Sequence, residues 1–215
     1  MENQAVITAD IVASRKIKPK QLEETLRDIA KGIEKVLFRR KKTFEFYRGD
    51  SFQAIVPPEL SLRVALIWKA AIQSVQENGK TWDIRIAIGI GNIAHKGAKV
   101  TTSSGKAFEY SGLLLDELKT KETPKLGIRT FDEKWNAQLE TECILADIIL
   151  QRWTAIGAES IYYALLYQET QEQLAARFGI TQSAVHKRLS AANWSAIRHW
   201  EQYFSQQALS FSKTK

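Results

Sequence analysis

The sequence predicts an α+β protein: a ferredoxin-like unit with the element order β-α-β-β-α-β, followed by an all-α domain that contains a helix-turn-helix. In the first half, short β-branched and aromatic runs alternate with segments whose apolar residues recur at helical spacing. From Glu133 the spacing is helical almost to the end, and residues 170–189 hold two short helical patterns separated by Gly179. These observations predict one domain over residues 1–135 and another over residues 136–215.

A buried strand is predicted for residues 6–13, because this β-branched run is too short for a typical helix. It contains one carboxylate, that of Asp10. Pro19 then opens a helix, since the N–H that proline lacks has no partner in a first helical turn. The apolar residues of this helix recur at steps of three and four: Leu22, Leu26, Ile29, Ile33 and Val36.

A β-hairpin is predicted for residues 44–56, where two apolar and aromatic runs meet at Gly49 and Asp50. Glycine tolerates the positive φ of a tight turn, and an aspartate at such a place is most often only a turn former. Helical spacing returns from Leu60 to Val75. Alternating apolar residues from Trp82 to Gly91 then predict a half-exposed strand.

The first domain is predicted to end with a loop over residues 93–104, a helix over 106–118 and a short strand over 126–130. In the β-α-β-β-α-β arrangement the first and third strands are adjacent at the centre of the sheet. We therefore expect Asp10 and Asp50 to be neighbours.

Two neighbouring aspartates at the end of a central sheet can bind a metal ion. Carboxylate oxygens are hard ligands for Mg²⁺, and two of them can fill much of its octahedral shell together with triphosphate oxygens. The backbone of residues 11–15 can turn N–H groups toward phosphate, and Arg15 adds positive charge. The residues thus predict a site for Mg²⁺ and a nucleoside triphosphate.

Three segments resemble the palm domain of class III nucleotidyl cyclases, which is shared more distantly with GGDEF diguanylate cyclases. They are TADIVASR at 8–15, RGDSFQ at 48–53 and RIAIGIG at 85–91. We therefore call residues 1–135 the palm. The resemblance implies that Asp10 and Asp50 bind the metal and that Ile11 offers its backbone carbonyl. The residues that we expect to contact the nucleotide are Ser14, Arg15, Arg48 and Lys106.

The resemblance does not extend to the residues that complete catalysis in those enzymes. In the helix after the glycine-rich strand end, Glu109 and Leu113 stand where the family has an Asn and an Arg that stabilise the transition state. Phe46 replaces the lysine that selects a purine. Across most of its length the chain also resembles the SatD-like family of bacterial proteins, through residues 7–15, 48–53, 104–108 and the C-terminal helical part.

A helix-turn-helix is predicted for residues 170–189, with Gly179 in the turn and Thr181 capping the second helix. The segment resembles those of phage repressors and of the promoter-binding region of sigma factors, whose second helix enters the major groove. Such units also serve as packing or dimerisation modules. The candidate DNA-binding residues are Gln182, Ser183, His186, Lys187, Arg188 and Ser190.

The composition favours a cytoplasmic protein with anionic partners. The 215 residues include 31 Lys+Arg and 24 Asp+Glu, so the net charge is +7. No acid lies between Glu172 and Glu201. The single cysteine, Cys143, excludes an internal disulfide, and no apolar run is long enough to predict a membrane span. The three histidines are scattered, so a zinc site is not expected.

The favoured hypothesis is a bacterial DNA-binding regulator of the SatD-like type, a homodimer whose palm binds Mg²⁺ and a nucleotide as its ligand. The alternative is a nucleotidyl cyclase-like or oligonucleotide-synthesising enzyme, which the helix-turn-helix localises or dimerises. In a third hypothesis the palm is a scaffold in which Asp10 and Asp50 serve folding, although a buried carboxylate without a partner is costly.

Overall fold

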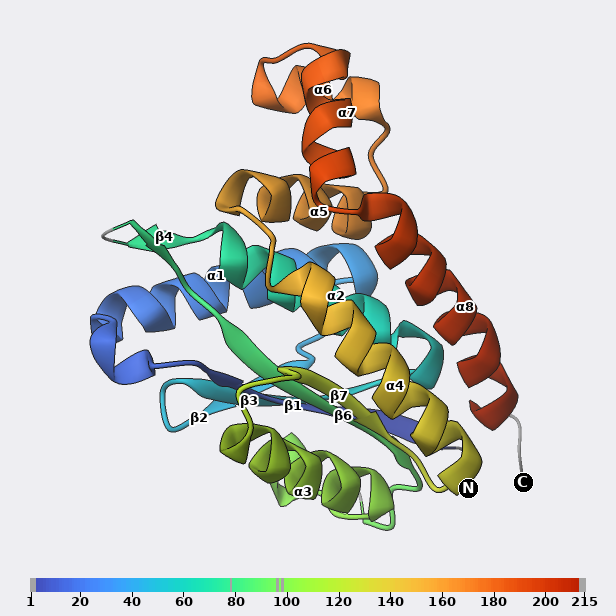
Figure 1. Cartoon of the computed structure of the whole chain (residues 1–215). Coiled ribbons are helices and arrows are strands. Elements are labelled where there is room, and N and C mark those ends of the chain that lie inside the picture. Colours follow the sequence, from blue (N-terminus) through green and yellow to red (C-terminus); the bar gives the residue numbers. More distant parts are fainter. Residues whose placement is uncertain (1–2, 78, 96, 98, 213–215) are drawn as a thin grey trace.

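The computed structural model describes residues 3–77, 79–95, 97 and 99–212. Figure 1 shows a central sheet with helices on both faces and a group of helices stacked beyond one face. The strands are β1 (Gln4–Ile11), β2 (Phe44–Tyr47), β3 (Ser51–Val56), β4 (Gln76–Glu77), β5 (Lys80–Thr81), β6 (Ile84–Gly91) and β7 (Leu126–Arg129). The α-helices are α1 (Pro19–Leu37), α2 (Pro58–Ser74), α3 (Lys106–Thr120), α4 (Glu133–Leu150), α5 (Ala155–Tyr167), α6 (Gln171–Phe178), α7 (Gln182–Ala191) and α8 (Trp194–Ser212).

The sheet has the strand order β2-β3-β1-β6-β7. β1 is antiparallel to both β3 and β6, so the first and third predicted strands are adjacent at the centre. The α+β class and the predicted order of elements are confirmed. The structure adds a feature that the prediction lacked, because the short strand β7 pairs in parallel with β6 and forms a fifth strand at the edge.

The two faces of the sheet are covered differently. Isoleucines at alternate positions of β6 join the buried core on the side of α1 and α2, whereas α3 packs on the opposite face (Figure 1). Close approach of α3 depends on Gly89, since a Cβ there would lie 2.2 Å from the carbonyl oxygen of Ala107. α3 lies mainly over β6, β1 and β7, so it covers only part of its face.

α2 is the central helix of the molecule. Most of its residues are buried, including Trp68 and Lys69, because one side packs on the sheet and the other on α5 and α8. A helix that is apolar on nearly all sides is stable only when it is enclosed in this way. The guanidinium of Arg63 on α2 donates two hydrogen bonds, of 3.0 and 3.2 Å, to the carboxylate of Glu201 on α8. The palm and the C-terminal helices therefore share one continuous hydrophobic core.

The outer edge of β7, which pairs with no other described strand, is covered by side chains of α4 that bond to its backbone N–H groups. The amide oxygen of Asn136 accepts a hydrogen bond of 2.7 Å from the Thr130 N–H, and the Ile128 N–H bonds to Cys143. At the start of the strand, the Lys125 N–H donates to the carboxylate of Asp147 at 3.1 Å. Backbone groups at a sheet edge need such partners when another strand does not supply them.

Two short helices, α6 and α7, occupy the end of the molecule that is farthest from α3 (Figure 1). Thr170 and Thr181 cap their N-termini, and Gly179 has the positive φ of 63° that ends α6. Leu174, Val185 and Leu189 are buried between these helices and their neighbours. Among the described residues, no helix is both long and apolar enough to cross a membrane.

A buried ion pair joins α2 to the start of β6. The Lys69 ammonium is fully buried and lies 2.5 Å from the carboxylate of Asp83, which Lys125 also contacts at 2.8 Å. Burial lowers the pKa of Lys69. Burial alone would raise the pKa of Asp83, but Lys69 and Lys125 together hold it below its ordinary value. The backbone carbonyl of Asp83 accepts from the Val12 N–H at 2.9 Å, so the pair also anchors the chain that follows β1.

We predict that Asp83→Ala lowers the free energy of unfolding by about 3–5 kcal/mol, because it leaves the Lys69 ammonium buried without a counter-charge. Lys69→Met should cost less, since Asp83 keeps Lys125 as its partner. Urea unfolding at pH 7 measures both. Lys31→Met, which breaks the exposed pair with Asp28, is the control and should change stability by less than about 0.5 kcal/mol. A loss for Lys69→Met that equals or exceeds that of Asp83→Ala would contradict this account.

Candidate functional site

The sheet brings Asp10 and Asp50 to one hydroxyl group. Asp10 lies at the end of β1 and pairs in register with Ser51, the first residue of β3, while Asp50 ends the hairpin turn. The Ser51 Oγ is 3.1 Å from an oxygen of Asp10 and 3.1 Å from an oxygen of Asp50. One hydroxyl proton can bond to only one of them at a time. The carboxylates of Asp10 and Asp50 therefore lie close to the same hydroxyl group, and they share its one proton.

The chain after β1 is fixed to the same turn. The Ile11 N–H donates to the backbone carbonyl of Asp50 at 3.0 Å, and the Ser14 Oγ donates to the Asp50 carboxylate at 2.6 Å. Ala13 adopts a left-handed conformation, with φ of 55°, that turns the chain into a short 3₁₀ helix at Ser14–Lys16. Ile11 and Ser14, both predicted from the sequence, thus lie beside the carboxylates.

Basic residues lie near the pair on α3, on β6 and on the two turns. The Lys119 ammonium, near the end of α3, is 4.0 Å from the Asp10 carboxylate. Arg85 on β6 stands opposite Asp10 in the strand register, and the side chains of Arg15 and Arg48 are exposed on the two neighbouring turns. Sequence reasoning missed Lys119, although a helix that returns antiparallel to β6 must end near the start of that strand, where Asp10 lies.

Lys106 is not brought to the carboxylates. It is the first residue of α3, and its ammonium donates to the Glu109 carboxylate at 2.8 Å. Lys119 lies thirteen residues further along the same helix, which corresponds to about 20 Å. Of the four residues expected to contact a nucleotide, Ser14, Arg15 and Arg48 lie on the turns that hold Asp10 and Asp50, and Lys106 lies at the other end of α3.

Tyr47, at the end of β2, reports the negative charge of this site. Its pKa is raised, first by burial and then by the carboxylate of Asp10; Arg48 opposes this shift, and Asp50 and Asp116 add smaller contributions in the raising direction. A phenol resists ionisation where other anions are close. The carboxylates of Asp10 and Asp50 therefore affect the pKa of a side chain on the neighbouring strand β2.

The donor set suits a hard divalent cation that also binds a ligand. Within the described part of the chain, no group of three or more His, Cys, Asp or Glu residues is arranged to hold a metal ion. Asp10 and Asp50 would thus supply two carboxylates, and oxygens of a phosphate ligand or water would complete the shell. Mg²⁺ is commonly bound by one or two carboxylates together with substrate phosphates.

The outer face of α7 carries most of the residues predicted to contact DNA. Gln182, Ser183, His186, Lys187 and Ser190 are all exposed. Arg188 differs from them, because it is half-buried with its guanidinium 5.4 Å from the centre of the Phe178 ring. Arg177 on α6 is paired with Glu169 and lies over the Tyr163 ring at 4.3 Å.

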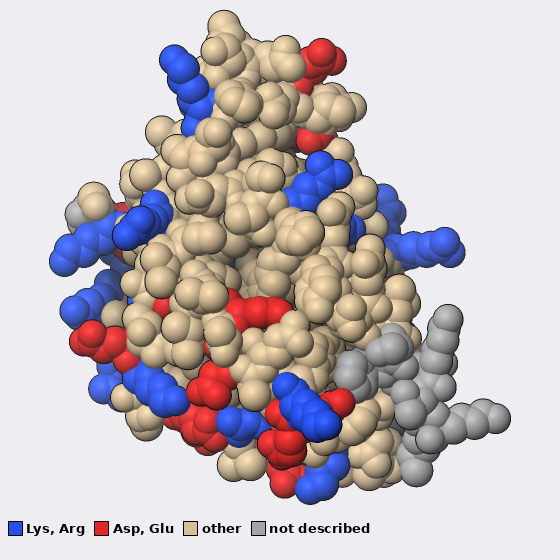
Figure 2. Space-filling view, turned by 45° about the vertical axis from the view of Figure 1, so that its right-hand side comes forward, with Lys and Arg blue, Asp and Glu red and all other residues tan. Residues whose placement is uncertain are grey.

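The face that contains α4 and α8 shows no continuous basic patch (Figure 2). Charged side chains of both signs crowd its lower part, and few lie over its middle and upper parts. The excess positive charge of the chain is therefore not gathered on this face into one basic surface that could bind a polyanion.

Comparison with known proteins gives a family match and a set of similar solved structures. The model of the SatD family matches residues 4–201. No curated protein matches the chain. One solved structure is the non-canonical dimeric guanylyl cyclase domain of the RhoGC fusion protein from the aquatic fungus Blastocladiella emersonii. It has a TM-score of 0.43 and 16% identity, and the match covers 60% of this chain and 79% of that chain. Another is the catalytic core of a rhodopsin-guanylyl cyclase with converted specificity in complex with ATPαS. It has a TM-score of 0.43 and 15% identity, and the match covers 59% of this chain and 77% of that chain.

We predict that Asp10→Asn lowers the pKa of the Tyr47 phenol, because it removes the carboxylate with the largest charge effect on that group. A pH titration followed by ¹³C NMR of labelled tyrosine rings measures the shift, and Tyr47→Phe assigns the signal. Asp28→Asn, on the surface of α1, should leave the titration unchanged. An unchanged Tyr47 pKa in Asp10→Asn would mean that the two side chains are not close.

Proposed function

The chain belongs to the SatD family, and we propose that it is a DNA-binding regulator whose palm binds a nucleoside triphosphate with Mg²⁺ as its ligand. The observation that carries the proposal is the convergence of Asp10 and Asp50 on the hydroxyl of Ser51 at the end of two central strands.

The metal site is supported by the charge of the pair. Two carboxylates that share one hydroxyl donor repel each other, and a divalent cation between them removes that repulsion. The Lys119 ammonium lies 4.0 Å from the Asp10 carboxylate, and it could pair with a phosphate group of the bound nucleotide.

The nucleotide site is supported by the two turns that carry the carboxylates. Ser14 and the left-handed Ala13 shape a turn after β1, and Arg15 and Arg48, on the two turns that carry the pair, have exposed side chains. A triphosphate placed there would meet cations and a metal ion, which are the groups that bind polyphosphate in proteins. Phosphate recognition would thus come from turns and not from a cavity.

The residues of α3 favour a role for the nucleotide as a bound ligand over a role as a substrate that is converted. By the resemblance to cyclases, Glu109 and Leu113 occupy positions where an Asn and an Arg stabilise the transition state. In this chain Glu109 is paired with Lys106, and the Leu113 side chain is 54% exposed. Neither supplies a donor to developing negative charge on a phosphate, which catalysis of phosphoryl chemistry requires.

The DNA-binding part of the proposal is supported by the exposed face of α7. Thr181 caps this helix, and its first turns present Gln182, Ser183 and His186, whose side chains can hydrogen-bond to base edges. Lys187 adds a cation suited to a phosphate contact. Two copies of α7 in a homodimer would match two half-sites, as in other helix-turn-helix proteins.

We expect Asp10→Asn with Asp50→Asn to abolish Mg²⁺-dependent binding of nucleoside triphosphate. Isothermal titration calorimetry with ATP and GTP, each with and without Mg²⁺, measures it. Asp28→Asn is the matched control and should bind as the unmodified chain does. Equal Mg²⁺-dependent affinity in the double variant and the unmodified chain would refute the two-aspartate site.

The same samples test the alternative, a nucleotidyl cyclase-like or oligonucleotide-synthesising enzyme. Incubation with each of the four nucleoside triphosphates and Mg²⁺ or Mn²⁺, followed by mass spectrometry, should return only the starting nucleotides. A cyclic or linked product that is lost in the double variant would replace the ligand role with a catalytic one.

We expect Lys187→Ala to weaken binding to mixed-sequence duplex DNA and to reduce the slope of log K against log salt by about 1, because one phosphate contact is lost. Fluorescence anisotropy over a range of salt concentrations measures both. Arg188→Ala should have a smaller effect, since this guanidinium lies over Phe178. Lys80→Ala, in the palm, is the control. Identical salt slopes for Lys187→Ala and Lys80→Ala would refute the role of α7.

A further inference from the structure

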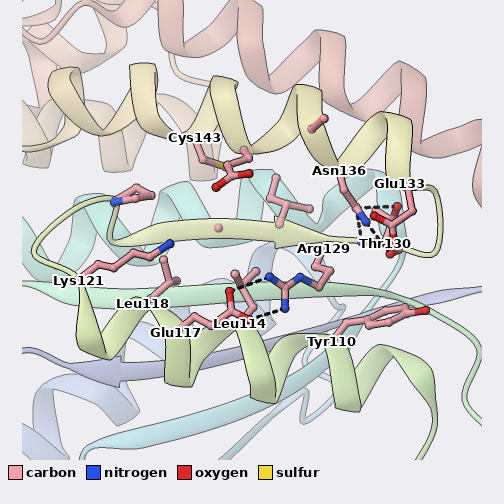
Figure 3. A pocket seen from close by; sticks show the side chains of 15 residues that line it. Tyr110, Leu114, Glu117, Leu118, Lys121, Arg129, Thr130, Glu133, Asn136 and Cys143 are labelled. Atoms are coloured by element: carbon pink, nitrogen blue, oxygen red, sulfur yellow. Dashed lines mark hydrogen bonds and ion pairs between the residues drawn. The ribbon is translucent and has the colours of Figure 1, made fainter.

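A cavity of about 490 Å³ lies beside the edge strand β7, between α3 and α4 (Figure 3). This volume is within the range of small-molecule sites in proteins. Its lining includes neither Asp10, Asp50 nor Lys119. The cavity is therefore separate from the candidate metal and nucleotide site.

The inner wall of the cavity is apolar and closely packed. Leu114, Leu118, Ile128 and Cys143 are buried there. A Cβ at Gly127 would lie 3.1 Å from a methyl carbon of Leu114, so Leu114 packs directly against the backbone of β7. The site is thus preformed by the packing of α3 on the strand.

The edge of β7 is not open to another strand at this place. The Ile128 N–H bonds to Cys143, and the Thr130 N–H donates to Asn136 at 2.7 Å. Burial raises the pKa of the Cys143 thiol, so it stays protonated and serves as a packing group. An extended peptide would need those N–H groups as donors. A small molecule that lies on the apolar wall fits better than a peptide strand.

The lining of the cavity carries more carboxylates than cations. The Arg129 guanidinium makes two hydrogen bonds, of 2.8 and 2.7 Å, to the Glu117 carboxylate, so these two charges cancel. Among the described residues, Glu133 and Glu140 have no hydrogen-bond or ion-pair partner, and Lys121 is the other cation of the lining. Figure 3 shows Lys121 and Glu133 at opposite ends.

The negative charges of Glu133 and Glu140 both affect Arg129, which also lines the cavity. The pKa of Arg129 is raised, chiefly by its hydrogen bonds to Glu117 and further by the charges of Glu140 and Glu133. Those carboxylates are therefore close to the guanidinium. Arg129 is already paired with Glu117, so an anionic ligand beside Glu133 and Glu140 would meet repulsion from their carboxylates.

We propose that this cavity binds a small organic cation with an apolar body. Its ammonium group would lie between Glu133 and Glu140, which are about two helical turns apart on α4, and its apolar body would lie against Leu114, Leu118 and Ile128. The proposal is independent of the palm's carboxylate pair.

Benzylamine is a suitable probe, with benzyl alcohol and benzoate as its neutral and anionic counterparts at equal ionic strength. In ¹H–¹⁵N NMR titrations of the full chain, benzylamine should give saturable shifts at Gly127, Ile128 and Ala137. We expect benzyl alcohol and benzoate to bind at least about fivefold more weakly, as the loss of one exposed ion pair implies. Equal affinity for the three probes, or no saturable shift with benzylamine, would overturn the proposal.

Variants of the lining test the assigned residues. Glu133→Gln with Glu140→Gln should weaken benzylamine about fivefold and leave benzyl alcohol unchanged, whereas Glu172→Gln on α6 should change neither. Ala137→Phe should fill the cavity and weaken all three probes, with folding checked by circular dichroism. Unchanged benzylamine affinity in the double glutamine variant would refute the carboxylate role. Calorimetry with Mg²⁺ and ATP on that variant should match the unmodified chain, which separates this outcome from failure of the palm site.

Discussion

The arrangement of the protein depends on the buried pair between Lys69 and Asp83. Burying a lysine in the middle of a helix is costly, and it is tolerated here because Asp83 accepts from it at the start of β6. That contact fixes α2 against the sheet. It also fixes the turn after β1, through the carbonyl of Asp83 and the N–H of Val12. Because α5 and α8 pack on the other side of α2, the same pair also supports the position of the C-terminal helices.

The candidate metal site combines this rigid base with exposed polar turns. Asp10 is on a central strand that is paired on both sides, whereas Asp50, Ser14 and Arg48 are on turns at the end of the sheet. Strand residues supply precision, and turn residues supply access to solvent. The cavity beside β7 has a different character, because both of its walls are helices and its floor is a capped strand edge.

Periodicity alone predicted the first six elements, and topology then predicted that Asp10 and Asp50 would meet. Those inferences succeed because apolar spacing and strand order are local or nearly local properties. The pairing of β7 with β6 could not be derived, since four residues carry no information about their partner strand. Lys119 was missed for a similar reason, because its position depends on the length and direction of α3. The expectation for Lys106 relied on nearness in sequence to the glycine-rich strand end, and α3 carries it away from the carboxylates.

The cover that α4 provides for β7 limits how the chain can be divided. A fragment that ended before Glu133 would keep every strand of the sheet but lose Asn136, Cys143 and Asp147, which bond to the edge N–H groups. It would also expose the side of α2 that packs on α5 and α8. Such a fragment would present an open strand and an apolar helix to its own copies, and both are starting points for aggregation. Solubility of the N-terminal half thus depends on residues that lie after it in the chain.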